Sequence, residues 1–165
     1  MKKLYFILTL AVVAVSACQQ KPETISVNIE NEQAILDSLF QQFSNAFKMQ
    51  DVSTLSSFLA EDALCLGTDP SEVWTKKEIT DLWNQMLADS SPEINYIGER
   101  IIKLASDGYS AVVVDQYFIP VMSPKIPWRN EYHLVKRNGN WKILVLCSSF
   151  IPKNEDIEKI NKAIE

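Results

Sequence analysis

Between residues 35 and 47, apolar side chains recur at steps of three and four, and polar side chains fill the positions between them. An α-helix turns once in about 3.6 residues, so this spacing places the apolar side chains on one face. The pattern predicts one amphipathic helix of about 18 residues. Its apolar face consists of Ile35, Leu36, Leu39, Phe40, Phe43, Ala46 and Phe47.

Two shorter helices are predicted after the long one. Asp51 is suited to cap the first of them, because its side chain can accept a hydrogen bond from the backbone of the first turn. Thr75 and Glu78 have the spacing of a capping box, which predicts the start of the second. Their inward positions are Leu55, Phe58 and Leu59 in the first, and Ile79, Leu82, Trp83, Met86 and Leu87 in the second.

Strands are predicted by runs with a period of two. Asp107-Gly108 and Asn138-Gly139 separate successive runs and are typical of hairpin turns. Strands are expected at 63–66, 72–74, 94–105, 109–121, 128–136 and 141–151, with a turn at 67–70, a longer loop at 120–127 and a last helix at 154–164. This order predicts an α+β fold in which a curved antiparallel sheet wraps around the long first helix, with a helix at the C-terminus.

The two faces of the sheet differ in composition. The even positions Val112, Val114, Gln116, Phe118, Leu134, Leu144 and Leu146 are nearly all apolar and are interpreted as core. The odd positions mix aromatic, aliphatic and charged side chains, which suits a protein interface better than a solvent-exposed surface. We therefore expect a homodimer formed through the outer face.

The N-terminus carries a targeting pattern. Lys2 and Lys3 precede an apolar run over 4–15 that is too short for a membrane span of about 20 residues. The run ends in Val15-Ser16-Ala17-Cys18, which resembles a bacterial lipoprotein signal. That resemblance implies removal of 1–17, acylation of Cys18 and a tether over 18–29, followed by a domain at 30–152 and a C-terminal helix within 153–165.

The net charge excludes some classes of function, and the positions of the cysteines bear on whether a disulfide forms. Without Lys2 and Lys3, 14 basic residues face 21 acidic ones, a net charge of about −7, which disfavours binding to nucleic acid. The protein is therefore expected to attach to a membrane through lipid on Cys18. Gln19 at the next position favours the outer membrane. Cys65 and Cys147 lie in apolar runs, which favours free thiols, although the compartment also permits a disulfide.

Several segments resemble a known family. Residues 59–63 and 67–75, together with 136–143 and Arg129, are similar to the SnoaL-like group of the nuclear transport factor 2-like superfamily. The resemblance implies a cone-shaped fold that serves isomerases, dehydratases, cyclases, transport adaptors and assembly domains. Where many relatives carry two histidines before a serine, this chain has Val145 and Cys147 before Ser149. The positions of the isomerase Tyr and Asp fall near Phe43 and near Leu66 or Gly67, so the resemblance does not carry the isomerase mechanism.

Two groups of residues are candidates for function. His133 is the single histidine, and Asp115 on the preceding strand could orient it as a general base, although a histidine on a sheet face is the commoner case. An apolar pocket in the cone is the other candidate, and a plain aromatic core is its alternative. Its residues are Phe43, Phe47, Trp83 and Tyr132, with Gln116 and Ser148 as polar groups.

No cofactor loop or metal-ligand pattern is found in the sequence, so no cofactor and no metal are expected. The sequence favours a lipid-anchored envelope protein that binds a small apolar ligand or another protein and is not an enzyme. An isomerase or hydrolase using His133 and Asp115, and a purely structural dimerisation module, remain as alternatives.

Overall fold

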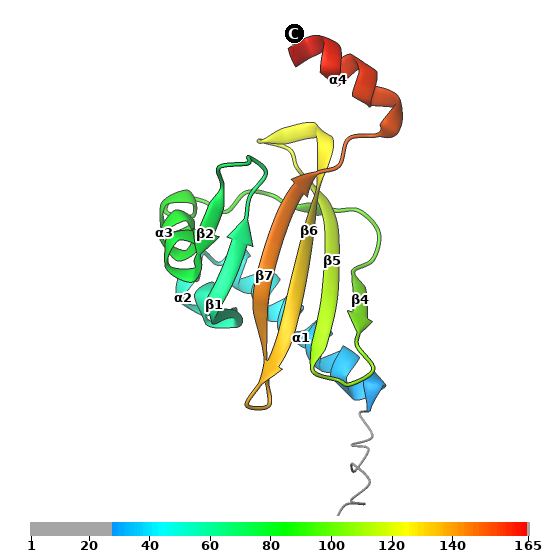
Figure 1. Ribbon diagram of the computed structural model, residues 1–165. Helices are drawn as coiled ribbons and strands as arrows, with labels where there is room; N and C mark the ends of the chain where they lie inside the picture. Colours follow the sequence, from blue (N-terminus) through cyan, green and yellow to red (C-terminus); the bar gives the residue numbers. More distant parts are fainter. Residues whose placement is uncertain (1–27, 165) are drawn as a thin grey trace, which may run out of the picture.

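The computed structural model describes residues 28–164, which form one mixed sheet with the first three helices packed on it (Figure 1). The sheet has the strand order β2-β1-β7-β6-β5-β3, and β4 also pairs with β5. The elements are α1 (Ile29–Lys48), α2 (Val52–Phe58), β1 (Leu59–Leu66), β2 (Val73–Thr75), α3 (Lys76–Met86), β3 (Asn95–Tyr96), β4 (Ile101–Leu104), β5 (Ser110–Ile119), β6 (Ser123–Arg137), β7 (Asn140–Phe150), a 3-10 turn η1 (Asn154–Asp156) and α4 (Ile157–Ile164).

Helix α1 is the long helix that the apolar spacing predicts, and it crosses one side of the curved sheet (Figure 1). Asn28 caps it by accepting a hydrogen bond from the Asn31 backbone N–H at 3.1 Å. Leu36, Phe40 and Phe43 are buried against the sheet. The predicted α+β fold with a sheet wrapped around the first helix is confirmed. The sheet is not wholly antiparallel, because β1 runs parallel to β7.

The predicted local signals are present. Asp51 caps α2, and Thr75 with Glu78 forms a capping box at the start of α3. Asn138 and Gly139 both have positive φ, 52° and 79°, as a tight hairpin turn between twisted strands requires. This turn fixes the pairing of β6 with β7, the two central strands.

Three predicted boundaries are wrong. The strand expected at 63–66 begins at Leu59, directly after the end of α2, so Leu59 belongs to β1 and not to the helix. The strand expected at 94–105 divides into β3 and β4, because the backbone between them leaves the sheet around Gly98, whose φ is 68°. The loop expected at 120–127 is shorter, since β6 begins at Ser123 and pairs there with Ile119. A register shift between β5 and β6 accommodates Pro124 and Pro127, which lie on β6 between Ser123 and Trp128.

The assignment of sheet faces from even and odd numbering is also wrong for β5. Val112, Val114, Gln116 and Phe118 lie on the outer face, whereas the odd positions point inward. Whether the odd or the even residues of a strand point inward can change from one strand to the next, because it depends on the length of the turn between them. Val113 on β5 pairs with Tyr132 on β6, and both are buried. The irregularity between β6 and β7 reverses parity again, so the inward residues of β7 are Trp141 and Ile143 before it and Leu146 after it.

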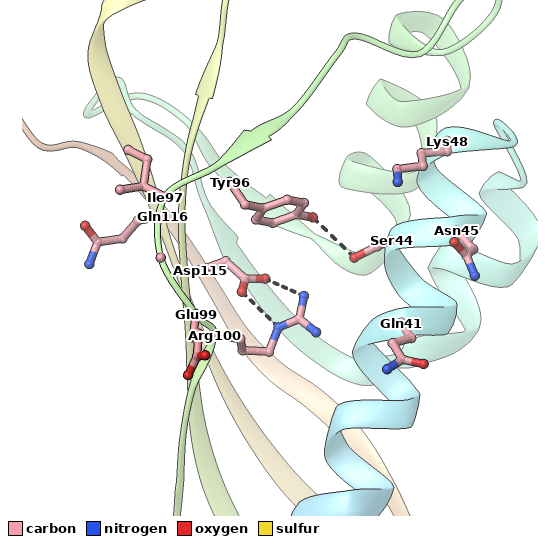
Figure 2. Close-up of a pocket in the computed structure, with 11 residues that line it drawn as sticks. Gln41, Ser44, Asn45, Lys48, Tyr96, Ile97, Glu99, Arg100, Asp115 and Gln116 are labelled. Carbon is pink, nitrogen blue, oxygen red and sulfur yellow. Dashed lines mark hydrogen bonds and ion pairs between the residues drawn. The ribbon is translucent and has the colours of Figure 1, made fainter.

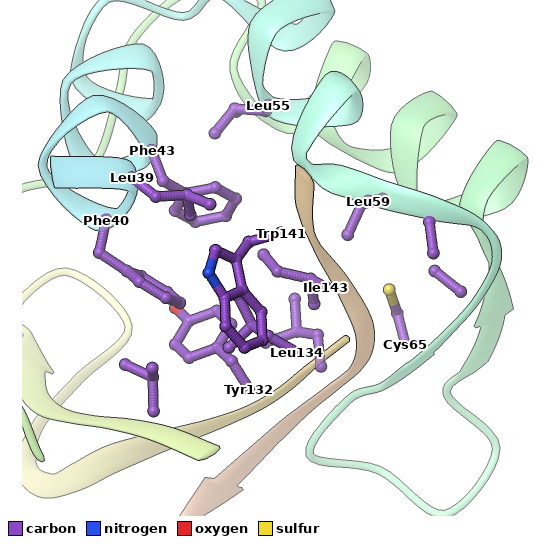
Figure 3. Packing of buried hydrophobic residues seen from close by; sticks show 14 of the residues in the cluster. Leu39, Phe40, Phe43, Leu55, Leu59, Cys65, Tyr132, Leu134, Trp141 and Ile143 are labelled. Carbon is purple, nitrogen blue, oxygen red and sulfur yellow. The ribbon is translucent and has the colours of Figure 1, made fainter. Parts of the chain in front are cut away.

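The core lies between α1 and the inner face of the sheet (Figure 3). The Phe40 and Tyr132 rings meet edge to face with centroids 4.7 Å apart. Cys65 is buried in this core, and Cys147 is half-buried on the neighbouring strand. Both thiols are free, as the sequence favours, and burial raises the pKa of the Cys65 thiol to about 11.

Helix α4 stands apart from the sheet, beyond the end of β7 (Figure 1). None of its residues is buried, and Ile157 and Ile164 are exposed. Within residues 28–164, no helix has the length and apolar character needed to cross a membrane.

Candidate functional site

A cavity of about 330 Å³ lies between α1, α3 and the inner face of β5, β6 and β7. Its walls are mainly aromatic and aliphatic, because the inward face of α1 and the apolar stripe of α3 meet the sheet there. The Phe43 ring contacts both Trp83 and Tyr132 edge to face, with centroids 6.2 and 5.9 Å apart. Trp74 and Trp128 also line the cavity.

The structure brings five of the six predicted pocket residues to this cavity. Phe43, Phe47, Trp83, Tyr132 and Ser148 all line it. The sixth, Gln116, lies on the outer face of β5, and its side chain points away from α1 (Figure 2). The reversed parity of β5 explains its position, since a neighbour of an inward residue must point outward.

A chain of hydrogen bonds crosses the sheet side of the cavity. Ser148 Oγ donates to Asn130 Oδ1 at 2.8 Å, and Asn130 Nδ2 donates to the Tyr132 hydroxyl at 3.0 Å. This direction leaves the proton of Tyr132 Oη at the end of the chain, free to be donated. Sequence reasoning missed Asn130, although its place two residues before Tyr132 on the same strand face is the signal that could have found it.

Two tyrosines of the cavity wall, Tyr132 and Tyr117, are held in the neutral form. Burial raises the pKa of Tyr132, and the nearby Tyr117 and Asp115 raise it further. Burial likewise raises the pKa of Tyr117, with smaller contributions from Tyr96 and Asp115. Both hydroxyls therefore remain protonated at neutral pH and can serve as hydrogen-bond donors.

Asp115 is buried in an ion pair rather than poised beside a histidine. Arg100 Nε and Nη2 donate to its two carboxylate oxygens at 2.8 and 3.0 Å. The Arg100 guanidinium lies 4.9 Å from the centre of the Phe40 ring, so packing also fixes its position. Both oxygens of the Asp115 carboxylate therefore accept a hydrogen bond from Arg100.

His133 and Asp115 are not brought together. Asp115 is opposite Asn130 on the inner face, whereas His133 is opposite Val112 and exposed on the outer face. The sheet separates the two side chains, so the predicted base and its orienting carboxylate do not form a pair in this structure.

A second, more open cleft of about 490 Å³ lies between α1 and the segment from Tyr96 to Arg100 (Figure 2). Its lining is largely polar and includes Gln41, Asn45 and Lys48 from α1. The Tyr96 hydroxyl and Ser44 Oγ are 3.2 Å apart and hydrogen-bonded across the gap between α1 and the sheet.

The described part of the chain contains no group of three or more His, Cys, Asp or Glu side chains placed to hold a metal ion. The predicted lipidation residue Cys18 and the signal segment before it lie outside the described residues.

Comparisons with known proteins agree on the domain. The sequence model of the SnoaL-like domain matches residues 36–153. No curated protein matches the chain.

Solved structures share the fold at low sequence identity. An NTF2-like protein of unknown function from Pseudomonas putida is 12% identical, with a TM-score of 0.63 over 76% of this chain and 91% of that one. A domain of unknown function with a cystatin-like fold from Nostoc punctiforme is 15% identical, with a TM-score of 0.64 over 80% and 85%. A DUF3225-family protein of unknown function from Pectobacterium atrosepticum is 16% identical, with a TM-score of 0.62 over 76% and 95%.

These structural likenesses show the fold alone, whereas the family match covers most of the chain. This protein therefore belongs to the SnoaL-like domain family, within the nuclear transport factor 2-like fold.

Proposed function

We propose that this protein binds a small, largely apolar ligand in the aromatic cavity, as a lipoprotein of the bacterial cell envelope. The observation that carries the proposal is the cavity itself. Its volume of about 330 Å³ lies within the range of small-molecule sites, and its apolar walls converge on a few polar groups, which is the usual composition of such sites.

The polar groups of the cavity wall orient the bound ligand. The hydrogen-bond chain from Ser148 through Asn130 ends on the Tyr132 hydroxyl, which donates to an acceptor such as a carbonyl or hydroxyl oxygen. Trp128 Nε1 on the cavity wall is buried without a hydrogen-bond partner within residues 28–164. A ligand with one or two acceptor oxygens on an apolar body matches this arrangement.

The arrangement does not favour the enzymatic alternative. A general base must reach the proton that it removes, and His133 lies on the outer face of the sheet, away from the cavity. Asp115 reaches the cavity, but Arg100 occupies both of its oxygens.

The outer face of the sheet supports the proposed homodimer. Val112 on β5, Leu64 on β1 and Ile101 on β4 are exposed apolar side chains on strands of one sheet. A second copy of the chain would cover such side chains, as dimer interfaces do. Sedimentation analysis tests this: a dimer supports it, and Val112→Glu is expected to shift the protein toward monomer.

Binding is tested with N-phenyl-1-naphthylamine, a neutral apolar dye whose fluorescence rises on leaving water. A domain beginning at residue 28 is suitable, because all residues of the main core lie between Leu36 and Leu146. We expect saturable binding of the dye. Ser148→Phe should fill the cavity and weaken binding about tenfold or more, a loss of about 1.4 kcal/mol.

Ser149→Phe is the matched control, since adjacent residues of a strand point to opposite faces. It should bind the dye like the wild type. Circular dichroism establishes that both variants are folded. Equal binding by the two folded variants, or no saturable binding by the wild type, contradicts the proposed function.

A further inference from the structure

The open cleft and the aromatic cavity share part of their walls. Ser44, Lys48, Tyr96 and Asp115 line both of them. The hydrogen bond between Ser44 and Tyr96 lies at this shared wall and connects α1 to the sheet side (Figure 2). Tyr96 is 45% exposed, so its side chain is not fixed by packing in the way that a core tyrosine is. A ligand that extends from one space to the other therefore passes Tyr96 and Ser44.

The two spaces offer different chemistry. The cavity is lined mainly by aromatic and aliphatic residues, whereas the cleft presents the amides of Gln41 and Asn45 and the ammonium group of Lys48. An elongated ligand that fills both needs an apolar body and a polar end. The side chains of the cleft decide the charge of that end.

Two cationic groups of the cleft have unused hydrogen-bonding capacity. Arg100 donates from Nε and Nη2 to Asp115, and its Nη1 makes no hydrogen bond to residues 28–164. Lys48 forms no ion pair with any residue of that range, although it lies on the same face of α1 as Ser44 and Asn45. Both groups donate hydrogen bonds and accept none.

The acidic groups of the cleft do not cancel the preference of these two cationic groups for an anionic ligand. Asp115 is already paired with Arg100, and the Glu99 carboxylate points away from α1 (Figure 2). The buried Asp115 charge nevertheless disfavours a doubly charged group such as a phosphate at this place. One exposed ammonium and one free guanidinium nitrogen suit a single negative charge.

We propose that the ligand is an amphipathic monocarboxylate, whose carboxylate binds in the cleft at Lys48 and Arg100 Nη1 and whose apolar body enters the aromatic cavity past Tyr96. This inference rests on the proposed function, because it identifies the chemical class of the ligand of that cavity. The carboxylate accepts hydrogen bonds from both cationic groups, and the amides of Gln41 and Asn45 border the same space.

The test compares three probes with the same ten-carbon chain: decanoate, decanol and decyltrimethylammonium. Each is titrated against the domain loaded with N-phenyl-1-naphthylamine, and displacement of the dye is measured. We expect decanoate to displace the dye at about tenfold lower concentration than decanol, the effect of one charge-assisted hydrogen bond, and the cation to be weakest. The advantage of decanoate should shrink with added salt, since Lys48 is exposed.

Substitutions in the cleft test whether its side chains cause the stronger displacement of the dye by decanoate than by decanol. Lys48→Gln should reduce the advantage of decanoate over decanol several-fold. Lys103→Gln, on strand β4, removes another exposed lysine and should behave like the wild type. The double variant R100Q/D115N replaces the buried ion pair by two neutral amides and should bring decanoate and decanol close to equal.

The outcomes separate the two proposals. If the dye binds but decanoate and decanol compete equally, or if Lys48→Gln and Lys103→Gln behave alike, the monocarboxylate inference is wrong and the apolar cavity stands. If the dye does not bind saturably to the wild-type domain, the proposed function fails, and the inference fails with it.

Discussion

At the scale of single residues, a buried carboxylate connects the first helix to the central hairpin of the sheet. Glu32 in the first turns of α1 accepts hydrogen bonds from Trp141 Nε1, at 2.8 Å, and from Lys136 Nζ. These two partners lower the pKa of Glu32, in spite of the opposing effect of burial. The contact connects α1 to the hairpin of β6 and β7 across more than 100 residues of sequence.

The first prediction concerns the charge of Glu32. Because its folded-state pKa lies below the ordinary 4.5, the ion pair stabilises the fold fully above that value. The contribution is lost as the pH falls through the lowered folded-state value. Glu32→Gln should therefore reduce the free energy of unfolding at pH 7 by about 1–3 kcal/mol, and this difference should vanish in acid.

Urea denaturation of both proteins at pH 7 and at pH 3 checks this prediction. Glu30→Gln, in the same helical turn and exposed, is the matched control and should have little effect at either pH. A deficit of the Glu32 variant that persists undiminished at pH 3 would show that shape, and not charge, is what matters at this position.

Some residue positions followed from the sequence and others could not. Phe43, Phe47, Trp83 and Tyr132 could be placed inward because their own helices and strands have regular periods. Gln116 was misplaced because its orientation depends on the register between β5 and its neighbour, which is set by pairing and not by local pattern. The pairing of Asp115 with Arg100 depends on the same register.

At the scale of elements, helix α3 depends on its capping box. Thr75 Oγ1 accepts a hydrogen bond from the Glu78 backbone N–H, and Glu78 Oε2 accepts one from the Thr75 backbone N–H at 2.8 Å. Ile79 and Trp83 on this helix form one wall of the cavity. The cap therefore stabilises both the helix and the candidate site.

Thr75→Ala should lower the free energy of unfolding by about 1 kcal/mol, the usual cost of losing such a cap. Urea denaturation measures it. Ser53→Ala, at an exposed position early in α2, removes a hydroxyl that has no hydrogen bond within residues 28–164 and serves as the control. Equal stability of Thr75→Ala and wild type would show that the capping box contributes nothing.

Helix α4 contrasts with α3, because it buries none of its residues. Deleting residues 153–165 should therefore change the free energy of unfolding by no more than about 0.5 kcal/mol, as for surface positions elsewhere. Thermal unfolding of the shortened domain checks this. A loss of several kcal/mol would mean that α4 packs on the domain in solution.

Helices and hairpin turns were the elements that the sequence predicted best. Capping residues and positive-φ turn residues act within a few positions of the chain, so Thr75, Glu78, Asn138 and Gly139 carry their signal locally. The parallel pairing of β1 with β7 joins segments far apart in the sequence, and nothing local in either strand indicates it.

At the scale of the whole molecule, the start of α1 and the helix α4 lie at opposite ends (Figure 1). The loop before β6, which supplies Met122 to the cavity wall, lies at the same end as α4. A lipid on Cys18 would therefore hold the domain by the end away from that loop. The overall fold class could be predicted because it follows from the order of elements, whereas the cavity results from packing between them.

The proposed anchor is tested on the full chain in bacteria. An alkyne analogue of palmitate should label the wild-type protein, which should fractionate with membranes. Cys18→Ser should abolish the label, because the proposed site of acylation is the Cys18 thiol. Labelling that survives in Cys18→Ser, or is lost in the control Cys147→Ser, would contradict the assignment of the anchor.

The most direct test of the cavity uses the four tryptophans, whose indole N–H groups give separate signals in a proton–nitrogen spectrum. Trp74, Trp83 and Trp128 line the cavity, whereas Trp141 does not and is held by Glu32. On titration with N-phenyl-1-naphthylamine, we predict saturable shifts of the first three signals and an unchanged Trp141. No shift, or equal small shifts of all four signals, would contradict a ligand-binding cavity.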